Sequence, residues 1–203
     1  MGIPLIIGIS GPTTSGKSTI SESIANDLHC PILCTDDYFK VNPEMPKTYF
    51  GDIEVINFDK VESIDWNMLI EDIKTRYENE KYLILEGFIL FGHPDIQDYV
   101  KMLIKIDYND DDMEIALNRR LTRNGYKNIE DCESNPYETR EKFCNFYFRK
   151  IAWPQRKENA KFLIPSNWKK PVLELSAIDN LEANIEKSRQ FVSQNLPSNC
   201  LII

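Results

Sequence analysis

Residues 11–18, GPTTSGKS, match the pattern G-x-x-x-x-G-K-[S/T] at every fixed position. Glycines let a backbone fold around a phosphate with its N–H groups pointing inward, and a following helix directs its partial positive charge at the anion. Lys17 would contact the β- and γ-phosphates, and Ser18 would ligate a bridging Mg²⁺. A glycine-rich turn is the alternative, but the segment lies between a predicted strand and a predicted amphipathic helix, as nucleotide binding requires. The expected ATP-binding residues are Gly11, Pro12, Thr13, Thr14, Ser15, Gly16, Lys17, Ser18 and Thr19.

Two adjacent carboxylates, Asp36 and Asp37, follow the apolar run PILCT. GTPases, motor ATPases and small-molecule kinases use the same phosphate cradle, but a GTPase should also carry N-K-x-D, which this sequence lacks. A kinase needs a carboxylate that accepts the proton of the acceptor hydroxyl, at the carboxyl end of a strand. We therefore expect one carboxylate to face the acceptor and the other to serve the metal shell or a cap. A pair that only caps the following turn is the alternative.

The elements that must position these residues are apolar runs that alternate with helical patterns. Short, mostly non-alternating runs are typical of strands in a parallel sheet covered on both faces, and they occur at residues 4–10, 31–35, 81–87, 101–107 and 171–175. Two helical faces are formed by Ile20, Ile24 and Leu28, and by Leu181, Ile185, Ser188, Val192 and Leu196. The alternation predicts an α/β, doubly wound fold with a mainly parallel five-stranded sheet.

Two segments fit this pattern poorly. Residues 41–60 contain Pro43, Pro46 and Gly51, and residues 124–136 are polar without periodicity. We expect both to be long loops or flaps, which in a compact domain are commonly functional. No repeat or linker divides the chain, so a single domain, 1–203, is expected.

Composition narrows the class of protein further. A net charge of −8 disfavours nucleic acid as a partner, so any anionic ligand must be held by a local basic site. The five cysteines show no disulfide or zinc spacing, which indicates a reduced, intracellular protein; we expect a cytoplasmic location and leave a nuclear one open. The N-terminus lacks signal-peptide features, and no apolar run approaches the ~20 residues that span a bilayer. Oligomeric state is left open.

The motifs taken together resemble a family, the nicotinamide riboside kinases within the wider uridine kinase group of P-loop kinases. The resemblance covers, in the family's order, IIGISGPTTSGKST, TDDYFK, NFDKVES, LILEGFILF, RRLTRNGY and YFRKIAWP. It implies a P-loop nucleoside kinase fold with a lid at about 119–140 and an acceptor-binding flap at about 38–60. The implied reaction is Mg²⁺-dependent transfer of the ATP γ-phosphate to the 5′-hydroxyl of nicotinamide riboside, which gives nicotinamide mononucleotide on a salvage route to NAD.

The resemblance also implies roles for acceptor-side residues. Asp36 matches the general base, Asp59 the carboxylate that binds the ribose 2′- and 3′-hydroxyls, and Phe58 the aromatic that stacks on the nicotinamide ring. A carboxylate can accept two hydrogen bonds from a vicinal diol, and an aromatic face suits a flat cationic ring. The alternative is that Phe58 is a core residue and Asp59 caps a helix beginning near Val61.

The donor side is carried over in the same way. Glu86, at the end of the third predicted strand, matches the acidic residue of the Mg²⁺ shell, with a salt bridge to Lys17 as the competing account. Arg119, Arg120 and Arg123 match lid arginines that contact the triphosphate. Arg119 and Arg123 share a helical face, whereas Arg120 falls about 100° away. Arginines that merely complement the helix dipole are the alternative.

Some features depart from the family. The family usually has Tyr or Trp at the position of Phe58, and uridine kinases also show N-F-D. The T-H-S-R-like segment of pyrimidine kinases is absent, which favours nicotinamide riboside over uridine or cytidine as acceptor. The lid carries Gly125 and a long acidic stretch. A nucleotide-binding switch without transferase activity is the remaining alternative, for which Asp36, Asp59 and Glu86 would be superfluous.

The chain ends in CLII, which fits the C-a-a-X prenylation pattern at Cys200. Isoleucine is unusual at the last position, and no polybasic stretch supplies a second anchor. An unmodified apolar tail is therefore the preferred interpretation.

Overall fold

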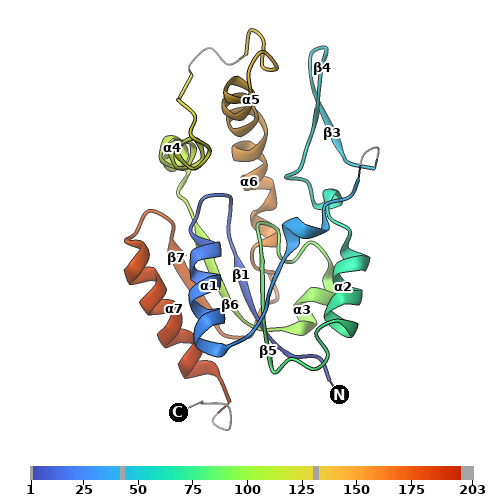
Figure 1. Ribbon diagram of the computed structural model, residues 1–203, viewed down its shortest axis with the longest axis vertical. Coiled ribbons are helices and arrows are strands. Elements are labelled where there is room, and N and C mark those ends of the chain that lie inside the picture. Colours follow the sequence, from blue (N-terminus) through green and yellow to red (C-terminus); the bar gives the residue numbers. More distant parts are fainter. Residues whose placement is uncertain (1, 42–43, 130–132, 198–203) are drawn as a thin grey trace.

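The computed structural model describes residues 2–41, 44–129 and 133–197. Its centre is a five-stranded parallel sheet in the order β2-β5-β1-β6-β7, which confirms the predicted fold class (Figure 1). Each strand falls within one residue of its predicted run. The strands are β1 (Leu5–Ser10), β2 (Ile32–Cys34), β5 (Tyr82–Gly87), β6 (Val100–Asp107) and β7 (Val172–Ser176).

Helices cover both faces of this sheet. They are α1 (Lys17–Leu28), α2 (Trp66–Thr75), α3 (Pro94–Tyr99), α4 (Met113–Asn124), α5 (Arg140–Tyr147), α6 (Trp153–Asn159) and α7 (Leu181–Asn195). Because successive strand residues point to opposite faces, Ile7 and Ile9 of β1 pack in one apolar cluster with α1 and α7. Ile6 of the same strand packs in the other cluster, with α2 and α3. This double burial explains why β1 is apolar on both of its faces.

The segment 41–60 is not the loop that its prolines and glycine suggest. Strands β3 (Lys47–Phe50) and β4 (Ile53–Ile56) pair antiparallel as a hairpin, so this prediction was wrong. Gly51, with φ of 58°, and Asp52 form a two-residue turn of the kind that hairpins favour. In Figure 1 the hairpin, α4 and α5 form the upper part of the molecule.

Helices α5 and α6 are joined into one rod by a π-helical turn, Phe148–Ala152. Pro154 lies in the first turn of α6 and lacks the N–H that a regular α-helix would use, which fits the altered hydrogen bonding just before it. Such turns occur often at functional sites. Tyr147, the last residue of α5, and Phe148, the first of the turn, are both buried in the apolar cluster that contains Ile7 and Ile9 of the sheet.

Among the described residues no helix is long and apolar enough to cross a membrane. Cys200, the candidate prenylation site, lies outside the described residues.

Candidate active site

The predicted phosphate loop connects β1 to α1 at the carboxyl edge of the sheet. At Gly11 a β-carbon would collide with the carbonyl oxygen of Ile106 and lie 2.8 Å from Ser15 Oγ, so only glycine fits. Gly16 precedes α1 with φ of 96°, a conformation that costs glycine little. The two fixed glycines of the motif are thus explained by the backbone that the loop adopts.

Ser18 and Glu86 meet below this loop. Ser18 Oγ, from the first turn of α1, donates to Glu86 Oε1 at 3.0 Å, from the end of β5. Glu86 is only 5% exposed, and its other oxygen, Oε2, has no hydrogen-bond partner within the described residues. A buried carboxylate oxygen without a partner is costly, so a cation or water at this point is physically reasonable.

The donor set fits Mg²⁺ held jointly with nucleotide phosphates. Mg²⁺ usually takes one or two protein oxygens and completes its octahedron with phosphate and water. Ser18 and Glu86 provide oxygen donors of that kind, whereas no cluster of three or more His, Cys, Asp or Glu in the described chain could hold a metal alone. The competing salt bridge from Glu86 to Lys17 is absent from the described residues.

Asp36 and Asp37 follow β2 in a 3₁₀ turn, Thr35–Tyr38, and they have different surroundings. Asp36 lines a cavity of about 350 Å³ together with Lys17 and Glu86, whereas Asp37 does not line it. The Asp36 side chain is open to the cavity, but nearby protein atoms desolvate it and raise its pKa. The charge of Lys17 lowers that pKa, and the charges of Glu86 and Asp37 raise it.

Asp59 is held beside this cavity by Tyr147 of α5. The Tyr147 hydroxyl donates to Asp59 Oδ2 at 2.7 Å and accepts from the Phe58 backbone N–H at 2.9 Å. Burial raises the pKa of Asp59, while the hydrogen bond from Tyr147 and the charges of Arg120 and Lys17 lower it. The alternative for Asp59 fails, because Lys60, not Asp59, precedes the short helix at Val61.

Phe58 is not a core residue, since 42% of it is exposed. Its ring lies 5.4 Å from that of Phe39, edge to face, and 6.4 Å from that of Tyr147. A second cavity, of about 540 Å³, adjoins the first at Phe58, Arg120 and Tyr147. Its other walls include Tyr126, Tyr137, Phe143 and Arg140. A cleft with carboxylates and the phosphate loop therefore adjoins an aromatic cavity.

The three arginines of α4 diverge. Arg120 and Arg123 line the cleft, although the helical spacing had paired Arg119 with Arg123. Arg119 Nη1 instead donates to the carbonyl oxygen of Ala177 at 2.7 Å and to the Tyr108 hydroxyl at 3.2 Å. The Arg120 guanidinium carbon lies 5.7 Å from the centre of the Tyr147 ring. Their contact with a triphosphate stays a prediction.

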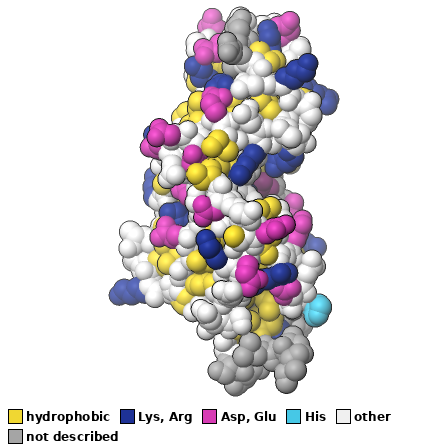
Figure 2. All heavy atoms as spheres, turned by 90° about the vertical axis from the view of Figure 1, so that its left-hand side faces the viewer, with side chains coloured by type: hydrophobic (Ala, Val, Ile, Leu, Met, Phe, Trp, Pro, Cys, Tyr) yellow, Lys and Arg dark blue, Asp and Glu magenta, His cyan; other side chains and the backbone are white. Residues whose placement is uncertain are grey.

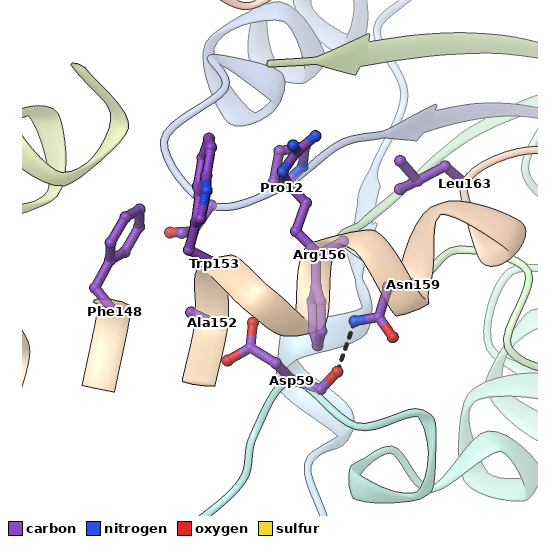
Figure 3. A pocket seen from close by; sticks show the side chains of 10 residues that line it. Pro12, Asp59, Phe148, Ala152, Trp153, Arg156, Asn159 and Leu163 are labelled. Carbon is purple, nitrogen blue, oxygen red and sulfur yellow. Dashed lines mark hydrogen bonds between the residues drawn. The ribbon is translucent and has the colours of Figure 1, made fainter. Parts of the chain in front are cut away.

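Tyr147 and Asn159 are site residues to which the sequence analysis gave no role. Asn159 Nδ2 donates to the backbone carbonyl of Asp59 at 2.7 Å, the dashed contact in Figure 3. Both lie on the α5–α6 rod, and Asn159 lines a further cavity together with Asp59 and Trp153. The segment YFRKIAWP contains Tyr147, but its spacing does not say which ring reaches the cleft, and Asn159 lies beyond it.

A solved structure shares this fold. A gluconokinase from Sinorhizobium meliloti superposes with a TM-score of 0.54 at 13% identity, over 96% of this chain and 94% of that one. This likeness shows that the chain has the fold of the P-loop kinases.

Relatives narrow the class, although no family model matches. The chain is 28% identical over 159 residues to a uridine kinase from Lactobacillus johnsonii, covering 64% of this chain and 72% of that protein. It is 30% identical over 150 residues to a uridine kinase from Histophilus somni, covering 59% and 68%. Human nicotinamide riboside kinase 1 is 29% identical over 104 residues, covering 43% and 51%. The chain belongs to the uridine kinase-like family of P-loop kinases.

Proposed function

We propose that the protein transfers the γ-phosphate of ATP to the 5′-hydroxyl of a ribonucleoside. One observation carries this: the cavity lined by Lys17, Asp36 and Glu86 shares Phe58 and Tyr147 with an aromatic cavity. A triphosphate site, a candidate base and space for a flat ring are thus neighbours. In this proposal residues 119–140 are the lid and residues 38–60 the acceptor flap.

The residues of the cleft have separate roles in this reaction. The phosphate loop and Lys17 bind and orient the β- and γ-phosphates, and Arg120 and Arg123 add positive charge where negative charge develops. Asp36 accepts the proton of the 5′-hydroxyl as the new P–O bond forms. Mg²⁺, held through Ser18 and Glu86 as the residues present allow, would neutralise phosphate charge when bound.

Asp59 and Tyr147 hold the ribose. With Oδ2 bonded to Tyr147, the other oxygen of Asp59 has no protein partner among the described residues and can accept from the sugar hydroxyls. Tyr147 also fixes the backbone of Phe58, so the diol-binding carboxylate and the stacking ring are held by one hydroxyl. A deoxyribonucleoside would leave this partly buried carboxylate short of a donor and should be a poor acceptor.

Nicotinamide riboside is the acceptor that we propose first. Its flat pyridinium suits a cavity walled by the rings of Phe58, Tyr137, Phe143 and Tyr147, since cations interact favourably with aromatic faces. Tyr137 and Phe143 stack nearly parallel, with ring centres 5.2 Å apart, and form one wall. The human relative carries the name of this activity.

Uridine or cytidine is the second candidate. The relatives from Lactobacillus johnsonii and Histophilus somni are named uridine kinase. The aromatic cavity also carries the cationic side chains Arg120 and Arg140, which would repel a pyridinium but donate to pyrimidine carbonyls. The electrostatics of this cavity therefore decide between the two acceptors.

An acceptor panel with Mg-ATP tests the proposal. Nicotinamide riboside, uridine, cytidine and their 2′-deoxy forms should be compared by kcat/KM, with Arg140→Leu as a second enzyme. We expect transfer to ribonucleosides, highest for nicotinamide riboside, and Arg140→Leu to favour the cationic acceptor further. Higher kcat/KM for uridine would establish the second candidate. ATP binding without transfer to any ribonucleoside would support the switch alternative.

A further inference from the structure

Thr14, in the middle of the phosphate loop, has an unfavourable backbone conformation. Its φ is 63°, in the left-handed region that β-branched residues rarely adopt. Among the described non-glycine residues only His29, at the end of α1, shares this property. Such a conformation persists only when its surroundings enforce it.

Tyr108 supplies the enforcing contact. This residue follows β6, and its hydroxyl donates to the backbone carbonyl of Thr14 at 2.6 Å. That carbonyl belongs to the peptide whose orientation depends on the dihedral angles of Thr14. The Thr14 hydroxyl lies 3.2 Å from the carbonyl oxygen of Ala116 in α4, so a second contact comes from the same direction.

Tyr108 is itself held on several sides. Its hydroxyl accepts from Arg119 Nη1 at 3.2 Å, and Arg119 also donates to the carbonyl oxygen of Ala177 after β7. Its ring is buried, with its centre 5.9 Å from that of Trp153. The Tyr108 backbone carbonyl accepts from Arg156 at 2.9 Å. The hydroxyl therefore cannot follow the loop if the loop relaxes.

We propose that Tyr108 is a positioning residue for the phosphate donor, which acts by holding Thr14 in the left-handed conformation. The loop N–H groups converge on a phosphate only in this backbone conformation, so the loop is ready before the nucleotide arrives. Because Arg119 on α4 shares the same hydroxyl, the orientation of α4 and the shape of the loop are linked. The proposal rests on the proposed use of a nucleoside triphosphate.

The test removes only the hydroxyl. For Tyr108→Phe we expect the Kd for Mg-ATP, measured by calorimetry without acceptor, to rise roughly three- to tenfold, the equivalent of one lost hydrogen bond. The KM for the acceptor nucleoside should stay within about twofold. Tyr147→Phe is the matched control, because it loses a hydroxyl on the acceptor side. This variant should raise the KM for the acceptor nucleoside and leave the Kd for Mg-ATP nearly unchanged.

A double-mutant cycle with Thr14→Gly tests the mechanism. Glycine adopts positive φ without strain, so Tyr108→Phe should change the ATP affinity by less than about twofold in the Thr14→Gly background. An equal loss in both backgrounds would show that Tyr108 does not act through Thr14. Unchanged ATP affinity in Tyr108→Phe would also overturn the proposal. Wild-type protein that bound neither ATP nor GTP would instead refute the donor, and with it the proposed function.

Discussion

Asp36 is the side chain on which the proposed transfer depends most, because it is the carboxylate of the pair that faces the cleft. For Asp36→Asn we expect kcat to fall by roughly 10²- to 10⁴-fold, the usual contribution of a general base. The Kd for Mg-ATP should change little, since the phosphate loop is a separate part of the site. Single-turnover kinetics and calorimetry on the same variant measure the two effects. Asp37→Asn is the control, and an equal loss there would contradict the distinction between the two carboxylates.

The pH dependence of the reaction follows from the same residue. Burial raises the pKa of Asp36, so this carboxyl is protonated at a higher pH than an ordinary aspartate. A base must be unprotonated, so kcat/KM should fall as the pH decreases through this raised pKa, above the usual value of about 3.9. The pKa of Asp59 is raised too, so its protonation should weaken acceptor binding in the same range. The pH profile of kcat at saturating acceptor separates the effect of Asp36 from that of Asp59. If Asp36→Asn still showed the acidic decrease in kcat, that decrease would belong to another group.

Residue types could be predicted where the chemistry demands one side chain. Gly11, Lys17 and Ser18 follow from the motif, and the backbone around Gly11 shows why no other residue fits. Tyr147 could not be predicted, because its role depends on a hydrogen bond to Asp59, 88 residues away in the sequence. Arg119 and Arg123 share a helical face, yet a carbonyl after β7 binds Arg119, which spacing alone cannot reveal.

At the scale of elements, the β3–β4 hairpin packs against α5, the helix that contributes Phe143 and Tyr147 to the aromatic cavity. Phe50 of β3 packs edge to face on Phe146 of α5, with ring centres 5.3 Å apart. The Tyr137 hydroxyl donates to the carbonyl oxygen of Glu54 in β4 at 2.6 Å. The hairpin therefore supports α5 and Tyr137, which line the cavity proposed for the acceptor.

For Phe50→Ala we expect a raised acceptor KM and an unchanged Kd for ATP. An aromatic pair contributes about 0.5–1.5 kcal/mol beyond its buried area, so the KM should rise up to roughly tenfold. Tyr49→Ala is the matched control, because its side chain points to the opposite face of the hairpin and is 63% exposed. Steady-state kinetics with each substrate varied measures both. A similar rise in both variants would mean that general loosening, not this contact, affects the acceptor.

The elements could be predicted in proportion to their burial. The strands β1 and β5 are buried almost throughout, and the edge strands β2 and β7 are less buried, but the apolar composition of each run identified all five. The hairpin is only partly buried: Lys47 and Tyr49 are exposed while Val55 is 1% exposed, so its apolar pattern is weak. Its Gly51–Asp52 turn was the one clear signal, and the nearby prolines outweighed it. The pairing of β3 with β4 depends on α5, which is more than 80 residues away.

On the scale of the whole molecule, the net charge is negative, but several cationic side chains line the cleft. The net charge is −8, and on the face seen in Figure 2 acidic and basic side chains are interspersed. One cavity is lined by Lys17, Arg120 and Arg123. These side chains form the local basic site that the negative net charge led us to expect for an anionic ligand. Asp36, Asp59 and Glu86 line it as well, so the unliganded cleft balances carboxylates against these cations.

This balance makes stability depend on Lys17, ATP and pH together. Lys17 is 9% exposed, and its charge lowers the pKa of both Asp36 and Asp59. For Lys17→Met the two pKa values should rise further. A carboxyl whose pKa is raised by folding destabilises the fold as the pH rises through that value, so the Tm without nucleotide should fall more at pH 8 than at pH 5. Removing a buried ammonium opposes this effect, but the uncompensated carboxylates should outweigh it.

Thermal unfolding at both pH values, with and without Mg-ATP, tests the prediction. Wild-type protein should gain about 2.7 kcal/mol of stability at an ATP concentration 100 times its Kd, and Lys17→Met should gain little. Lys74→Met, which removes an exposed lysine from α2, should retain the gain and show no such pH dependence. A Tm for Lys17→Met above that of wild type at pH 8 would contradict the prediction. It would mean that the desolvation cost of the Lys17 ammonium exceeds the stabilisation that it gives to the nearby carboxylates.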